Sequence, residues 1–116
     1  MEIQQVGKVF SATITRIERK TAAEVFTNKK GEFTGEYTKP TDPVVVIYAK
    51  APDRAEDTKI ATFNIPVTGY IHAKSKLHKF LRVVLPDAKT ISDDLHELIG
   101  AQIQVLFDES GFMRLA

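Results

Sequence analysis

A two-residue hydrophobic period near the start of the chain constrains the fold more than any other feature. From residue 7 to residue 20 apolar and polar residues alternate, and many of them are β-branched. Successive side chains of a β-strand point to opposite faces, so this period is typical of a strand with one buried face. The residues expected on the buried face are Phe10, Ala12 and Ile14, and those on the exposed face are Ser11, Thr13 and Thr15.

Four later stretches also have the character of strands. Residues 44–50 are almost continuously apolar, which predicts a strand covered on both faces. Residues 59–67 alternate again, and Pro66 predicts an edge position or a strand end because proline has no backbone donor. Residues 101–107 alternate as well, and a polar turn then leads to a short last strand at 112–115.

Residues 23–38 have the pattern of a hairpin inserted after the first strand. Two short β-prone stretches, 25–27 and 32–34, flank the four-residue connection 28–31. That connection begins with asparagine and ends with glycine, which both tolerate the positive φ angles of a tight reversal.

A period of three to four residues predicts one amphipathic helix at 75–85. Its apolar stripe consists of Leu77, Phe80, Leu81 and Val84, and the cations Lys76, Lys79 and Arg82 lie off that stripe. Ser75 is expected to cap the N-terminus. A shorter helix is predicted at 93–99, with Ser92 as its N-cap and Gly100 as the terminating residue.

Five principal strands with a helix between the third and the fourth form the element order of the OB-fold, a small Greek-key barrel. Over residues 7–115 the chain resembles OB-fold single-stranded nucleic-acid-binding proteins in this order, without a sequence motif. The resemblance implies a mainly β chain forming an OB-like Greek-key β-barrel, with the amphipathic helix at its open end. The hairpin at 23–38 would then lengthen the connection between strands 1 and 2. The hairpin and the second helix also allow another meandering β-barrel or an α+β sandwich.

Length and composition predict a single core. The chain has 116 residues, of which 43% are hydrophobic and 27% charged. Both fractions are ordinary for one globular domain. We expect residues 1–6 to be a loose lead-in and residues 7–116 to form a single OB-like domain. The aromatic residues assigned to the core are Phe10, Phe63, Phe80, Phe107 and Phe112.

A net charge of +1 conceals a local imbalance. Residues 72–82 carry four cations and no acid, whereas residues 83–116 carry six acids and two cations. A solvated helix face, a phosphate-binding patch or a surface for an acidic protein partner would each explain the basic segment. The sequence has no cysteine, no long apolar run and no signal-peptide pattern, so we expect no disulfides and no membrane contact. The expected compartment is the cytoplasm, or the nucleoid if the chain binds nucleic acid.

The sequence contains no motif typical of catalysis. It has no G-x-S-x-G, P-loop or G-x-G-x-x-G pattern. His96 lies near Asp93 and Glu97, and an exposed polar helix face explains that grouping without a metal. Acidic residues such as Asp57 and Asp108 fall in polar turns, where solvation accounts for them. We therefore expect no enzymatic activity, no cofactor and no metal.

Interleaved aromatic residues and cations are the pattern that points to function. Single-stranded nucleic acid is bound by cations that contact phosphates and by aromatic faces on which bases stack. In OB-folds the connection between strands 1 and 2 is a ligand-contacting loop. The hairpin candidates are Phe26, Lys29, Lys30, Phe33, Tyr37 and Lys39. The other candidates are Tyr48 in the apolar strand and Tyr70, Lys74, Lys76 and Lys79 around the start of the basic helix.

Two functions follow from these patterns. The first, which we favour, is a non-catalytic module that binds single-stranded DNA or RNA. The second is a protein-interaction or assembly module, such as a homodimer or a small viral or phage accessory protein. There the hairpin and the basic helix would contact a neighbour, and the edge strand at 59–67 would pair across the interface.

Overall fold

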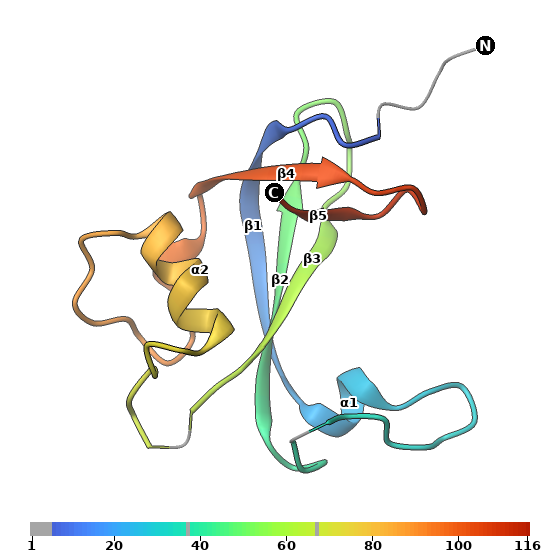
Figure 1. Ribbon diagram of the computed structural model, residues 1–116, viewed down its shortest axis with the longest axis vertical. Helices are drawn as coiled ribbons and strands as arrows, with labels where there is room; N and C mark the ends of the chain where they lie inside the picture. Colours follow the sequence, from blue (N-terminus) through green and yellow to red (C-terminus); the bar gives the residue numbers. More distant parts are fainter. Residues whose placement is uncertain (1–5, 37, 67) are drawn as a thin grey trace. The chain divides into compact units, whose positions relative to one another are not determined.

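The computed structural model describes residues 6–36, 38–66 and 68–116 (Figure 1). Residues 1–5 of the predicted lead-in lie outside the described residues. The regular elements are β1 (Phe10–Thr21), α1 (Ala22–Phe26), β2 (Pro43–Lys50), β3 (Thr58–Asn64), α2 (Lys76–Val84), the 3-10 turn η1 (His96–Leu98), β4 (Gln102–Phe107) and β5 (Met113–Leu115). Among the described residues, no helix has both the length and the apolar character that a bilayer crossing requires.

The five strands form an antiparallel sheet in the order β3-β2-β1-β4-β5. β1 pairs with β4, with Phe10 opposite Val105, and β4 pairs with β5, with Phe107 opposite Met113. The prediction of a mainly β chain with an amphipathic helix between the third and fourth strands is confirmed. Pro66 lies just beyond β3, which stands at one end of the strand order.

The chain divides into two compact units. Unit 1 takes in the described residues of Met1–Ile17, Ile47–Ala61 and Lys89–Ala116, and unit 2 takes in those of Glu18–Val46 and Thr62–Ala88. β1, β2 and β3 each contribute residues to both units. A single domain over residues 7–116 therefore stays a prediction.

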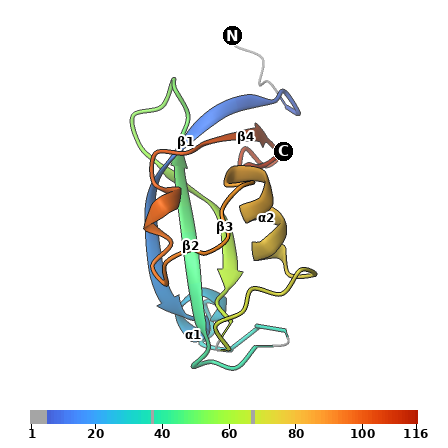
Figure 2. The same cartoon turned by 90° about the vertical axis from the view of Figure 1, so that its left-hand side faces the viewer.

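Unit 1 has an aliphatic core. Its fully buried residues include Ile14 of β1, Ile47 of β2, Leu98 of η1 and Val105 of β4. Both backbone groups of Ile14 form hydrogen bonds with the segment before β4. The Ile14 carbonyl accepts from the amide of Gly100 (2.8 Å), and the Ile14 amide donates to the carbonyl of Ala101 (2.9 Å). Figure 2 shows this segment beside β1.

The alternation predicted for the first strand is confirmed in β1. Ile14 is buried on one face. On the other face, Gln104 Nε2 donates to Ser11 Oγ at 3.0 Å, and Gln102 Nε2 donates to Thr13 Oγ1 at 2.8 Å. Polar cross-strand pairs of this kind stabilise an exposed sheet face. The two-residue period therefore separates a buried face from a hydrogen-bonded polar face.

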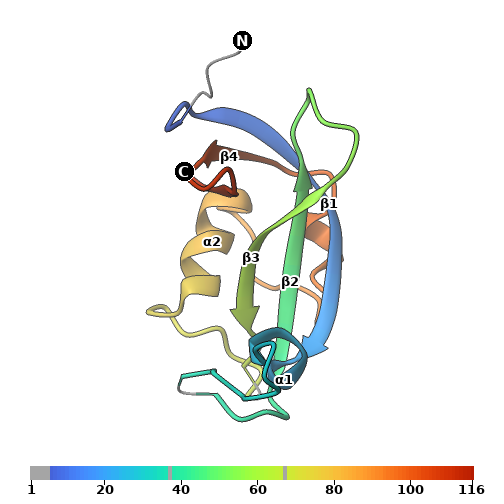
Figure 3. The same cartoon turned by 90° about the vertical axis from the view of Figure 1, so that its right-hand side faces the viewer.

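Unit 2 buries aromatic residues between α2 and β3. Leu77 and Phe80 of the predicted apolar stripe are buried, and so is Phe63 of β3. The ring centroids of Phe63 and Phe80 are 5.1 Å apart, with the ring planes inclined by 32°. Figure 3 shows α2 alongside the end of β3. Aromatic packing therefore attaches the helix to the strand.

The first arm of the predicted hairpin is a helical turn, α1, rather than a strand. Thr21 and Glu24 form a capping box: Thr21 N donates to Glu24 Oε2 (2.9 Å), and Glu24 N donates to Thr21 Oγ1 (3.4 Å). Threonine followed three residues later by glutamate is a helix-start signature. The sequence therefore carries the signal for this turn. Of the strand predicted at 25–27, only Thr27 pairs with the second arm, in an isolated β-bridge with Phe33.

The short helix predicted at 93–99 is present only as the 3-10 turn His96–Leu98. The residue before the turn, Leu95, is buried with φ +55°, in the left-handed region that interrupts a helix. Ser92 does not act as the N-cap. Its hydroxyl instead donates to the carboxylate of Glu97 (2.8 Å). Such local side-chain bonds compete with helix formation.

Phe112 is 66% exposed, so its assignment to the core is wrong. Phe112 lies between the turn and β5, and the residue that is buried is the next one, Met113, where the strand begins. Of the other rings assigned to the core, Phe10 and Phe107 are half-buried, with centroids 5.2 Å apart.

Candidate functional site

α2 keeps its cations away from its apolar residues. Ser75 caps the helix as predicted, because its Oγ accepts a hydrogen bond from the amide of His78 (3.1 Å). Lys76, Lys79 and Arg82 are exposed, whereas the apolar stripe is buried or half-buried. Arg82 Nη1 donates to a backbone carbonyl just past the helix (3.0 Å). The lysines of α2 therefore lie on the side of the helix that faces solvent.

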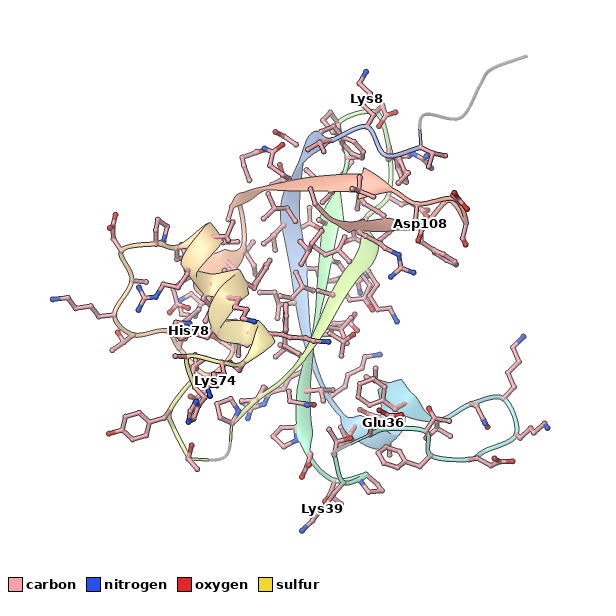
Figure 4. All side chains as sticks on the ribbon, viewed as in Figure 1. Lys8, Glu36, Lys39, Lys74, His78 and Asp108 are labelled. Carbon is pink, nitrogen blue, oxygen red and sulfur yellow. The ribbon has the colours of Figure 1, made fainter. Side chains whose placement is uncertain are left out.

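The segment that leads into α2 exposes an aromatic ring. Tyr70 is 81% exposed. It follows Gly69, whose φ of +81° lies in the left-handed region that glycine favours. The carbonyl of His72 then accepts bonds from both the amide (2.9 Å) and the hydroxyl (2.8 Å) of Ser75, which closes a turn before the helix. Lys74, in that turn, is exposed (Figure 4).

The tip of the hairpin is held by Asn28. Its Oδ1 accepts from the amides of Lys30 (2.9 Å) and Glu32 (3.0 Å), and its carbonyl accepts from the amide of Gly31 (3.0 Å). Gly31 has φ +81°, which is the positive angle expected for this reversal. Lys29 and Lys30 are both exposed at the tip.

The two phenylalanines of the hairpin are half-buried. Thr27 and Phe33 form an isolated β-bridge, and the carbonyl of Phe26 accepts from the amide of Thr34 (2.7 Å). The Phe33 ring lies so close to Gly35 that a Cβ at that glycine would be 2.6 Å from Phe33 Cζ. The Phe33 ring therefore takes part in the packing of the hairpin itself.

The candidates of unit 2 form two separate groups. Lys39 is exposed and points outward (Figure 4), whereas Tyr37 lies outside the described residues. The hairpin group consists of Phe26, Lys29, Lys30, Phe33 and Lys39. The basic-helix group consists of Tyr70, Lys74, Lys76 and Lys79. Figure 1 shows the hairpin and α2 well apart within unit 2, so these groups are not one cluster.

Tyr48 belongs to unit 1 and is half-buried under an arginine that the sequence patterns do not single out. Arg16 Cζ lies 3.8 Å from the centroid of the Tyr48 ring. The same guanidinium donates from Nη2 to Asp57 Oδ1 (3.2 Å) and from Nε to Asp57 Oδ2 (3.4 Å). Thr15 Oγ1 also donates to Asp57 Oδ2 (2.9 Å). Asp57 is therefore hydrogen-bonded within the fold as well as lying in the polar turn that the sequence predicts.

The Asp57 carboxylate is stabilised in its charged form. The hydrogen bond from Arg16, and next the bond from Thr15, hold the pKa of Asp57 below its ordinary value of 3.8. The sequence offers one signal for Arg16: it stands two residues after Ile14, where the period of the first strand would place another apolar residue. Its partner at position 57 could be found only from the folded chain.

A second polar cluster surrounds His96 in unit 1. His96 Nδ1 lies 2.7 Å from Asp94 Oδ1 and 2.9 Å from Ser92 Oγ, and its Nε2 lies 3.7 Å from Glu97 Oε1. The hydrogen bond to Asp94, and next the charge of Glu97, raise the pKa of His96. Bonds from Ser92 and His96 lower the pKa of Asp94 to about 2. The described residues include no group of three or more histidine and acidic side chains that could hold a metal ion.

We expect Asp94→Asn to lower the pKa of His96, because it removes a charged hydrogen-bond acceptor. In the native protein the raised pKa means that His96 contributes stability fully below pH about 6.5, the unfolded-state value. That contribution is lost as the pH rises through the folded-state pKa. NMR titration of the His96 ring measures the midpoint. The control is Asp93→Asn, because Asp93 takes no part in these hydrogen bonds, and this variant should move the midpoint less. Equal shifts for both variants would contradict the conclusion that the bond to Asp94 raises the pKa of His96.

Comparison with known proteins identifies no family. No protein-family model, no curated protein and no solved structure matches the chain. Function is therefore inferred from the geometry and chemistry of the residues.

Proposed function

We propose that the chain is a non-catalytic, OB-like module that binds single-stranded DNA or RNA in the cytoplasm without a cofactor. The observation that carries the proposal is the exposure of the basic-helix group. The Tyr70 ring is open to water, and the exposed Lys74, Lys76 and Lys79 follow it in a segment without an acid. Exposed cations contact phosphates, and an exposed ring provides a face on which a base stacks.

An exposed ring favours single strands over duplex. In a duplex each base is already stacked between its neighbours, whereas an unpaired base can be splayed out onto an aromatic side chain. The net charge of +1 gives little general attraction to nucleic acid, so the affinity depends on the local group of lysines. Binding should therefore weaken as salt rises, because each neutralised phosphate releases counterions.

The hairpin group supplies further contacts in this proposal. Lys29 and Lys30 are exposed at the tip and can reach phosphates. Phe26 and Phe33 are half-buried, so each presents only part of its ring to a base. The hairpin therefore serves mainly as a source of charge, and Tyr70 is the principal stacking residue of unit 2.

We expect Tyr70→Ala to weaken binding to a fluorescently labelled oligo-dT by at least about 5-fold, the low end of the effect of losing one stacked base. Fluorescence anisotropy at fixed salt measures the affinity. The control is Phe112→Ala, which removes a similarly exposed ring from unit 1 and should leave the affinity unchanged. If both variants bind as tightly as the native chain, Tyr70 is not a stacking residue.

A homodimer is the second candidate function, and two observations favour it. β3 stands at one end of the strand order, where an edge strand can pair with another chain. Unit 1 also exposes the apolar side chains Val6, Val9 and Phe112. Light scattering coupled to size-exclusion chromatography would give the mass in solution. A dimer that dissociates when the hairpin is deleted supports an assembly role, and a monomer at high concentration overturns it.

A further inference from the structure

Arg16 in unit 1 is held by contacts on two sides. Its guanidinium lies over the Tyr48 ring, with Cζ 3.8 Å from the ring centroid. Two of its nitrogens donate to the two oxygens of Asp57, at 3.2 and 3.4 Å. A guanidinium held by a ring below and a carboxylate at its edge keeps a fixed plane. Even so, the Arg16 side chain remains 47% exposed.

The geometry favours stacking over phosphate binding at this arginine. The Asp57 carboxylate balances the guanidinium charge and accepts from Nε and Nη2, so it occupies one of the edges through which an arginine can bind a phosphate in bidentate fashion. The half-exposed side chain thus carries a delocalised plane whose charge is already paired. Unpaired bases stack on arginine guanidinium planes as well as on aromatic rings.

We propose that Arg16, backed by Tyr48 and oriented by Asp57, forms a stacking platform for an unpaired nucleobase. This inference rests on the proposed function, because the ligand class is the same. It adds a nucleobase contact in unit 1 to the phosphate contacts proposed for the lysines of α2. Thr15 supports the platform indirectly, since its hydroxyl donates to the same Asp57 oxygen as Arg16 Nε.

Arg16→Lys is the variant that tests the platform. Lysine keeps the positive charge and can still pair with Asp57, but it has no planar group on which a base can stack. We expect oligo-dT affinity to fall by at least about 5-fold. The dependence of affinity on salt should stay the same because the charge is retained. Tyr48→Leu, which removes the ring and keeps an apolar side chain, should also lower the affinity.

The matched control is Arg54→Lys. Arg54 is another exposed arginine of unit 1 near a ring, with Cζ 4.8 Å from the Phe107 centroid. This variant should bind as the native chain does. A 2-aminopurine placed in the oligo-dT gives a second readout, because its fluorescence is quenched on stacking. The quenching should shrink in Arg16→Lys and persist in Arg54→Lys. Circular dichroism confirms that each variant is folded, and Arg16→Lys decides the test if Tyr48→Leu does not fold.

The outcomes separate this inference from the proposed function. Full affinity and full quenching in Arg16→Lys overturn the platform while native binding to oligo-dT still supports the proposed function. If the native chain does not bind oligo-dT at low salt, the proposed function fails, and the platform fails with it.

Discussion

Phe80→Ala is expected to lower the free energy of unfolding by about 3–5 kcal/mol, the usual cost of removing a buried phenylalanine. Phe80 is buried in unit 2, and its ring packs on Phe63 with centroids 5.1 Å apart. Removing the ring leaves a cavity between α2 and β3. Whole domains are stable by only about 5–15 kcal/mol, so this loss would consume much of the stability.

The matched control for Phe80→Ala lies on the same helix. Val83 is 80% exposed, and Val83→Ala should change the free energy of unfolding by no more than about 0.5 kcal/mol. Urea unfolding followed by circular dichroism measures both variants. A loss below about 1 kcal/mol for Phe80→Ala would contradict the packing of α2 on β3.

Replacing three lysines of the basic-helix group by glutamine is expected to reduce oligo-dT affinity by about 100-fold at 0.1 M salt. The replaced residues are Lys74, Lys76 and Lys79, all exposed. For single strands each phosphate contact adds about 0.7 to the slope of log affinity against log salt. Loss of three contacts should therefore flatten the slope by about 2 and remove about two decades of affinity at that salt.

The control for the triple variant removes the same total charge elsewhere. Lys8, Lys59 and Lys89 are exposed and belong to unit 1, outside the proposed contacts. Replacing these three by glutamine should leave the salt slope close to that of the native chain. Equal slopes for the two triple variants would mean that net charge, rather than the basic-helix group, determines binding.

Strands and the long helix could be predicted from the sequence because both depend on local periodicity. The two-residue period separates the buried Ile14 from the polar pairs of Ser11 and Thr13. The stripe that contains Leu77 and Phe80 identifies α2 in the same way. Burial follows such periods wherever one face of an element meets the core.

The irregular segments could not be predicted as well, because local side-chain bonds and tight turns determine them. Ser92 donates a hydrogen bond to Glu97 instead of capping a helix, and Leu95 has a positive φ, which is rare for leucine. An apolar neighbourhood predicts a buried Phe112, but this residue lies between the turn and the start of β5 at Met113, and it is exposed. Hydrophobicity alone therefore does not locate a ring next to a turn.

The sequence predicts which residues make up the candidate site, but it does not predict how they are arranged in space. The exposure of Tyr70 and of the lysines of α2 agrees with what a binding surface requires, but their role stays a prediction. Arg16 could not be linked to Asp57 from the sequence, because the two are 41 residues apart and meet only through the fold. The sequence likewise does not predict that the hairpin lies apart from α2, which Figure 1 shows.

The most direct test of single-strand binding is the anisotropy of a labelled oligo-dT titrated with the native chain. An oligonucleotide of about 30 nucleotides exceeds the roughly 4–16 nucleotides that one such module covers. The titration is made at low and at moderate salt, with a duplex of the same length as the control. We predict binding to the single strand that is tighter than binding to the duplex and that weakens as salt rises. No binding at low salt, or equal binding to the duplex, would contradict the proposed function.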